Sequence, residues 1–105
     1  MVKIAPSLLS ANFACLKQEI DKIEAAEWIH YDVMDGHFVP NISFGYSILK
    51  DISKVTDKYL DVHLMISDPF KYVDNFIASN ASLIVFHYEA VEENEIDKLI
   101  KYIKN

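Results

Sequence analysis

Two short segments of the sequence carry the side chains best suited to chemistry. The first, Trp28–Met34, is rich in β-branched and aromatic residues and stops at the turn signal Asp35-Gly36, which predicts a strand. Because side chains alternate along a strand, His30, Asp32 and Met34 share one face. An unpaired buried carboxylate is costly, so this face holds either a His–Asp hydrogen bond or a functional site.

The second segment, Tyr59–Ile66, repeats the arrangement with His63 and Met65 on one face. If the two strands are neighbours, His30, Asp32 and His63 form a set of two histidines and one carboxylate. Such a set suits Zn²⁺, Fe²⁺ or Mn²⁺. Spacing alone favours a metal site and a hydrogen-bonded polar cluster in the core about equally.

Longer motifs surround these residues. Residues 30–41 are H-Y-D-V-M-D-G-H-F-V-P-N, residues 6–10 are P-S-L-L-S, and residues 61–66 are D-V-H-L-M-I. In order and spacing the sequence resembles the ribulose-phosphate 3-epimerase family. The resemblance covers essentially the whole chain, which corresponds to the first half of the family's (β/α)₈ barrel.

The resemblance implies a reaction and assigns roles to residues. The reaction is inversion at C3, which interconverts D-ribulose 5-phosphate and D-xylulose 5-phosphate in the pentose phosphate pathway. His30, Asp32 and His63 would bind a divalent metal, and Asp32 would also be one of two acid/base residues. Four side chains are expected to contact the substrate: Ser7, Met34, His63 and Met65. By composition alone the two methionines would be core residues.

Two parts of the family pattern lie beyond Asn105: the second acid/base Asp, and the Gly-rich phosphate-binding loops. The resemblance therefore predicts that the 105-residue chain is a poor epimerase that keeps weak metal affinity. The alternative is a non-catalytic remnant or an oligomerising half-barrel module.

The hydrophobic pattern predicts strands that alternate with helices in a single α/β domain, residues 1–105, with a parallel sheet. The strands are expected at residues 3–9, 28–34, 59–66 and 82–87, the last of them buried on both faces. The helices are expected from Phe13 (with Ser10 or Asn12 as N-cap), from Tyr46, from Pro69 behind the N-cap Asp68, and from Ile96 to Asn105. A four-stranded doubly wound sheet fits this pattern as well as a (βα)₄ half-barrel of the ribulose-phosphate-binding type, and only the resemblance selects the half-barrel.

Other side chains receive simpler interpretations. Tyr31 should pack against the helices, and His37 should be an exposed loop residue. For His87 we expect a satisfied position at the rim of the sheet, with a role behind the metal ligands as the alternative. The helix from Pro69 should turn Phe70, Val73, Phe76 and Ile77 inward. The last helix is predicted from the spacing of its apolar residues, Ile96, Leu99, Ile100 and Ile103.

Composition narrows the class of protein. The net charge of −6 disfavours nucleic acid and anionic membrane surfaces as partners. The single cysteine, Cys15, excludes an internal disulfide and fits a reducing compartment, and no signal peptide or membrane-spanning run is present, so a cytoplasmic location is expected. An open half-barrel would expose strand edges and its inner face, which predicts a homo-oligomer.

Overall fold

A computed structural model describes residues 2–104, and it contains a parallel three-stranded sheet. The strands are β1 (Trp28–Met34), β2 (Tyr59–Met65) and β3 (Leu83–Phe86), in the order β1-β2-β3. The helices are α1 (Leu16–Lys22), α2 (Tyr46–Ser53), α3 (Pro69–Ala78) and α4 (Ile96–Lys104), and the 3₁₀ turns are η1 (Leu8–Ser10), η2 (Phe13–Cys15), η3 (Tyr88–Ala90) and η4 (Glu93–Glu95). The predicted alternation of strands and helices is confirmed from residue 16 onward.

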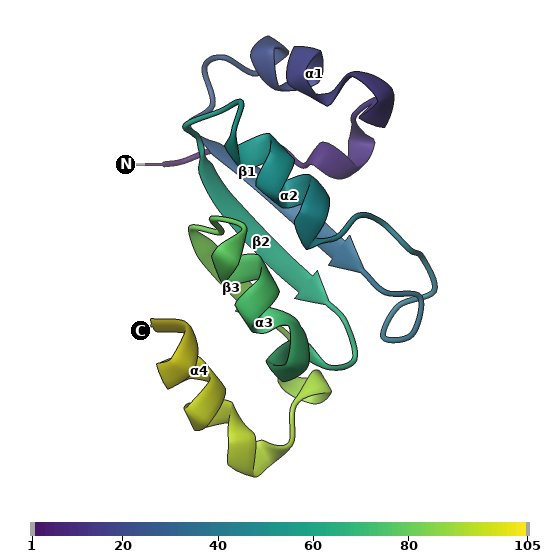
Figure 1. Ribbon diagram of the computed structural model, residues 1–105, viewed down its shortest axis with the longest axis vertical. Coiled ribbons are helices and arrows are strands. Elements are labelled where there is room, and N and C mark those ends of the chain that lie inside the picture. The colour runs from purple at the N-terminus through teal and green to yellow at the C-terminus, as the bar shows by residue number, and fades with distance from the viewer. Residues whose placement is uncertain (1, 105) are drawn as a thin grey trace.

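The sheet is covered by helices on one face. Figure 1 shows α2 and α3 lying across the same side of the strands. The side chains that face them are buried: Ile29, Tyr31, Val33, Leu60, Val62 and Leu64. The intervening residues of β1 and β2 are half-buried or exposed. Helices α2 and α3 connect β1 to β2 and β2 to β3, and both lie on the same face of the sheet. A doubly wound sheet carries connecting helices on both faces, so that alternative is wrong.

Local signals set the helix starts largely as predicted. The Asp68 carboxylate accepts a hydrogen bond from the Lys71 amide, with Pro69 at the first helical position of α3. Asn12, one of the two expected caps, accepts from the Ala14 amide, but the residues that follow form η2 before α1 begins. The last helix extends to Lys104, and Asn105 lies outside the described residues.

The strand predicted at residues 3–9 is wrong. Its segment contacts β1 through a single bridge, Ser7 to His30, supported by the hydrogen bond from the His30 amide to the Pro6 carbonyl. Pro6 has no N–H to donate to a ladder, and the chain turns into η1 at Leu8. The segment therefore lies beside β1 without becoming a strand.

The strand predicted at residues 82–87 is present as β3, but the prediction that it is buried on both faces is wrong. β3 is an edge strand, and Leu83 and Val85 are 38% and 41% exposed. Ile77, which was expected to face inward, is likewise 41% exposed. The apolar composition of residues 82–87 indicated burial on both faces, whereas the exposure expected of an open sheet describes Leu83 and Val85 better.

Two hydrogen-bonded residues anchor the long loop after β1. The Ser43 hydroxyl donates to the Asp32 carbonyl at 2.7 Å and accepts from the Met34 amide at 2.9 Å. The Asp35 carboxylate accepts from the amides of His37 and Phe38 and from both the amide and hydroxyl of Ser67, after β2. These contacts fix the carboxyl ends of β1 and β2 side by side.

Candidate metal centre

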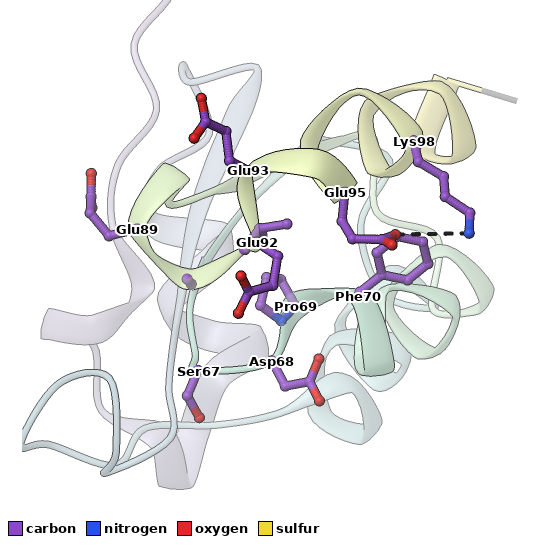
Figure 2. A pocket seen from close by; sticks show the side chains of 11 residues that line it. Ser67, Asp68, Pro69, Phe70, Glu89, Glu92, Glu93, Glu95 and Lys98 are labelled. Carbon is purple, nitrogen blue, oxygen red and sulfur yellow. Dashed lines mark ion pairs between the residues drawn. The ribbon is translucent and has the colours of Figure 1, made fainter.

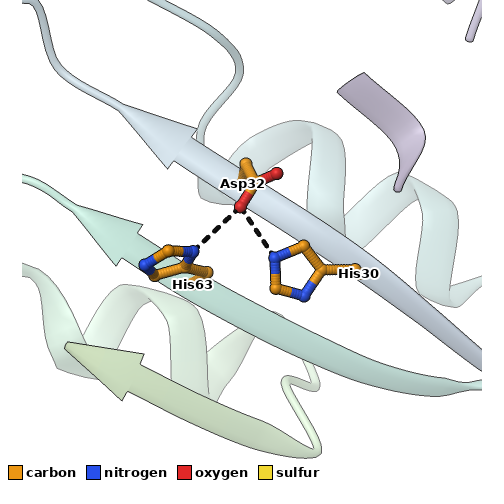
Figure 3. A group of neighbouring side chains, drawn as sticks. All are labelled: His30, Asp32 and His63. Carbon is orange, nitrogen blue, oxygen red and sulfur yellow. Dashed lines mark hydrogen bonds and ion pairs between the residues drawn. The ribbon is translucent and has the colours of Figure 1, made fainter. Parts of the chain in front are cut away.

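The register of β1 against β2 brings the candidate site together. His30 lies opposite Asp61, and Asp32 lies opposite His63. Each imidazole on the open face therefore has a carboxylate as its cross-strand neighbour. Figure 3 shows His30, Asp32 and His63 converging on this face of the two strands.

One carboxylate oxygen joins the three predicted ligands. Asp32 Oδ1 lies 2.8 Å from His30 Nε2 and 3.0 Å from His63 Nδ1 (Figure 3). The three side chains are only 13–27% exposed. These contacts give Asp32 and both imidazoles a polar partner without a metal ion, which is the hydrogen-bonded cluster considered as the alternative to a metal site.

The same residues also fit a metal ion. His30, Asp32 and His63 each offer a ligand atom, and these atoms lie within 4.8 Å of one another. Two imidazole nitrogens and a carboxylate oxygen are ligands that Zn²⁺ takes at catalytic sites, where three protein ligands leave a position open. The donor set is equally compatible with Fe²⁺.

Asp61 is a member of the cluster that the sequence analysis missed. Its Oδ2 lies 2.9 Å from His30 Nδ1, and its Oδ1 is buried without a hydrogen-bond partner among the described residues. The available signal was its position two residues before His63, which places it on the same face of β2.

Two carboxylates change the acid–base behaviour of His30. Burial alone lowers the pKa of His30, but the hydrogen bond to Asp61 and the negative charges of Asp32 and Asp61 outweigh it, so the pKa lies above its ordinary value. Without a metal ion, both ring nitrogens are therefore suited to donate to carboxylates. A metal ion would replace the proton on Nε2.

The residues expected to contact substrate lie around the cluster. The Ser7 hydroxyl is 3.3 Å from Asp32 Oδ2, and it also accepts from the Leu9 amide. Met34 and Met65 lie opposite each other in the register, both half-buried at the carboxyl ends of their strands. The structure thus brings all six predicted site residues to one region: Ser7, His30, Asp32, Met34, His63 and Met65.

The remaining predicted positions are as follows. His37 is exposed, as expected, and Tyr31 is fully buried on the helix side, where its hydroxyl donates to the Gly45 carbonyl. His87, immediately after β3, has its Nε2 2.8 Å from Nε2 of His63. His87 thus contacts the predicted ligand His63, as expected if it has a role behind the metal ligands. Cys15 is half-buried and free.

A separate pocket of about 600 Å³ lies between the start of α3 and the η3–η4 segment. Its lining includes five carboxylates and one lysine, Lys98, which is paired with Glu95 (Figure 2). Negative charge of this density opposes binding of a phosphate group. None of the six predicted site residues lines this pocket.

No helix within residues 2–104 is long and apolar enough to cross a bilayer.

Comparison with known proteins gives consistent matches. Residues 3–105 match the Ribulose-phosphate 3 epimerase family. The ribulose-phosphate 3-epimerase of Chlamydia pneumoniae is 45% identical over 105 residues, covering 98% of this chain and 45% of the relative. That of Bacillus subtilis is 51% identical over 92 residues, covering 86% and 42%. The cytoplasmic isoform of Oryza sativa is 44% identical over 104 residues, covering 97% and 45%. The chain thus spans less than half the length of these relatives.

Proposed function

The chain belongs to the ribulose-phosphate 3-epimerase family, and on this premise we propose that it carries the metal-binding and proton-abstracting part of an enzyme that interconverts ribulose 5-phosphate and xylulose 5-phosphate. The observation that supports this most directly is the shared oxygen of Asp32, which faces two imidazoles at once. The catalytic residue of the proposal is Asp32. The metal ligands are His30, Asp32 and His63.

The two oxygens of Asp32 would have different tasks. Oδ1 faces both imidazoles and is placed to bind the metal with them. Oδ2 faces the Ser7 hydroxyl at 3.3 Å and remains available to take the C3 proton, which is acidic because it lies next to the ketone. A bound divalent cation supplies the positive charge that stabilises the enediolate. Ser7, Met34, His63 and Met65 would contact the sugar phosphate and hold C3 near Asp32.

Inversion also needs an acid on the opposite face of the substrate. Within residues 2–104 Asp32 is the carboxylate of the cluster that faces the predicted substrate contact Ser7, whereas Asp61 faces His30 and its second oxygen is buried. We therefore expect the isolated chain to exchange the C3 proton with solvent while turning over slowly as an epimerase. A non-catalytic module that keeps the metal cluster is the alternative.

The architecture fits one half of a barrel, (βα)₄, in a single domain. Closure of a barrel would cover the face that carries the cluster. On that face Leu83 and Val85 of β3 are exposed, and Trp28 and Tyr59 stack with ring centroids 4.3 Å apart. An apolar surface of this kind favours association, so we expect a homo-oligomer. A cytoplasmic location is proposed, and the sugar phosphate is the expected partner rather than nucleic acid or a membrane.

The test separates proton removal from inversion. The chain, supplied with Zn²⁺ or Mn²⁺, is incubated with ribulose 5-phosphate in D₂O, and NMR follows both deuterium at C3 and formation of xylulose 5-phosphate. Deuterium uptake that is lost in Asp32→Asn and kept in the matched surface variant Asp57→Asn would support the proposal. If the unmodified chain binds metal without deuterium uptake, the non-catalytic alternative is correct.

A further inference from the structure

We propose that Asp61 is a positioning residue, which accepts the Nδ1 proton of His30 and thereby directs the Nε2 lone pair of His30 toward the metal site. This inference rests on the proposed metal centre. It assigns a task to a carboxylate that is neither a predicted ligand nor a predicted acid/base group.

The geometry of the pair is set by the sheet. His30 and Asp61 are opposite each other in the parallel register, and Asp61 Oδ2 lies 2.9 Å from His30 Nδ1. The Asp61 side chain is 14% exposed. Both residues belong to strands whose opposite faces are buried, so the backbone positions that hold the contact are fixed.

An ionised carboxylate can only accept hydrogen bonds, so Asp61 at Nδ1 and Asp32 at Nε2 compete for the ring proton of a neutral, metal-free His30. A metal ion would bind Asp32 together with Nε2 of His30, which leaves the ring proton on Nδ1 for Asp61 to accept and the lone pair on Nε2. That nitrogen is the one 2.8 Å from Asp32 Oδ1, within the candidate ligand set. Metal-binding histidines commonly donate their other ring N–H to a carboxylate in this way.

His63 provides an internal comparison. Its Nδ1 faces Asp32, and its Nε2 faces Nε2 of His87. An imidazole nitrogen can be a donor or an acceptor, so His87 does not impose one tautomer on His63. Within the described cluster, Asp61 is therefore the carboxylate outside the ligand set that contacts a ligand histidine.

Asp61 is kept in a costly environment. Its Oδ1 is buried with no hydrogen-bond partner in residues 2–104. Leaving a buried polar atom unsatisfied is unfavourable, and more so when it is charged. A functional role is one explanation for such an atom, and the contact with His30 supplies that role.

The experiment uses Asp61→Asn, which keeps size and shape, and Asp57→Asn as the matched control at an exposed position two residues before β2. The ¹⁵N shifts of the His30 ring are measured on Zn²⁺-loaded protein, where they tell which ring nitrogen binds the metal and which keeps its proton. Zn²⁺ affinity is then measured by calorimetry, and circular dichroism checks the fold. The amide side chain introduced by Asp61→Asn can present its NH₂ group to Nδ1 of His30. The ring proton would then favour Nε2, the nitrogen that should bind the metal.

We expect the unmodified chain and Asp57→Asn to bind Zn²⁺ through Nε2 of His30 with the ring proton kept on Nδ1, and Asp61→Asn to bind Zn²⁺ with affinity lowered by about 10–100-fold. If His30 of the unmodified chain binds Zn²⁺ through Nδ1, the inference is overturned even if Asp61→Asn does not fold. Equal Zn²⁺ affinity in both folded variants also overturns it, while leaving the metal centre standing. An unmodified chain that binds no Zn²⁺ would overturn the metal centre and, with it, this inference.

Discussion

The Nε2 atoms of His63 and His87 lie 2.8 Å apart, with the two rings stacked at a centroid distance of 4.9 Å. This contact extends the cluster to the end of β3. A continuous series of polar contacts thus crosses the open face of all three strands, in the order Asp61, His30, Asp32, His63 and His87. The proposed ligands lie at the centre of this series, and each end is closed by a residue outside the ligand set.

His87 is expected to support His63 less strictly than Asp61 supports His30. Replacing His87 with Leu removes an imidazole, which does not impose one tautomer on His63, so we expect Zn²⁺ affinity to fall by no more than about tenfold, the low end for such supporting groups. The exposed loop variant His37→Leu is the control and should bind Zn²⁺ as the unmodified chain does. Calorimetric titration checks both, and a loss in His87→Leu as large as in Asp32→Asn would mean that His87 is itself a ligand.

Ser7 connects the N-terminal segment to Asp32. Its hydroxyl accepts from the Leu9 amide and faces Asp32 Oδ2, each at 3.3 Å. For Ser7→Ala we expect a loss of about 0.5–1 kcal/mol in unfolding free energy, because an N-capping contact of η1 is removed. Zn²⁺ affinity should be unchanged, while deuterium uptake at C3 of ribulose 5-phosphate should slow. Chemical denaturation and NMR measure these, with Ser10→Ala as the control, and unchanged uptake would remove Ser7 from the substrate site.

Gly36 is required by the loop after β1. It has φ of +76°, and a Cβ there would lie 2.8 Å from Ile42 Cγ1. We expect Gly36→Ala to lower the free energy of unfolding by about 1–3 kcal/mol, because both the left-handed backbone and the close contact oppose a side chain.

Gly45→Ala is the matched control for this loop. A Cβ at Gly45 would meet no atom within 4 Å, and its φ of −117° suits other residues. Its cost should be below about 1 kcal/mol, since glycine is a better N-cap than alanine but has no capping side chain to lose. Equal denaturation midpoints for the two variants would show that the loop adapts to a side chain at Gly36.

The sequence predicted most of the sheet and the ligand set because both depend on short-range periodicity. The alternation in Trp28–Met34 and Tyr59–Met65 was sufficient to place His30, Asp32 and His63 on one face. It was not sufficient for residues 3–9, where Pro6 and the turn at Leu8 limit pairing to one bridge. Propensity indicates an extended segment there but not how many hydrogen bonds it makes.

Register and edge position are the features that a single sequence does not encode locally. Asp61 became part of the cluster only once it was seen opposite His30, since a one-residue shift would change every cross-strand pair. Likewise, the apolar residues of β3 indicate a buried strand, whereas its place at the edge of the sheet leaves Val85 exposed. Both depend on contacts between segments distant in the chain.

Asp35 provides the clearest prediction for pH dependence. Burial alone raises the pKa of Asp35, but hydrogen bonds from the amides of Ser67, His37 and Phe38 and from the Ser67 hydroxyl outweigh it and lower the pKa from 3.8 to about 2. The folded state thus binds the proton more weakly than the unfolded chain does. Asp35 therefore stabilises the fold above the unfolded pKa, and this contribution is lost as pH falls from about 4 to about 2.

Comparing the unmodified chain with Asp35→Asn isolates this contribution. At neutral pH we expect the variant to be less stable by about 1–2 kcal/mol, after allowance for the partial exposure of Asp35. The difference should narrow as pH falls below about 4, because the protonated carboxyl of the unmodified chain also loses its charged hydrogen bonds. Urea denaturation across this pH range measures it, with the exposed Asp57→Asn as control. A stability difference that stays constant down to pH 2 would show that Asp35 acts through its shape and neutral hydrogen bonds rather than through its charge.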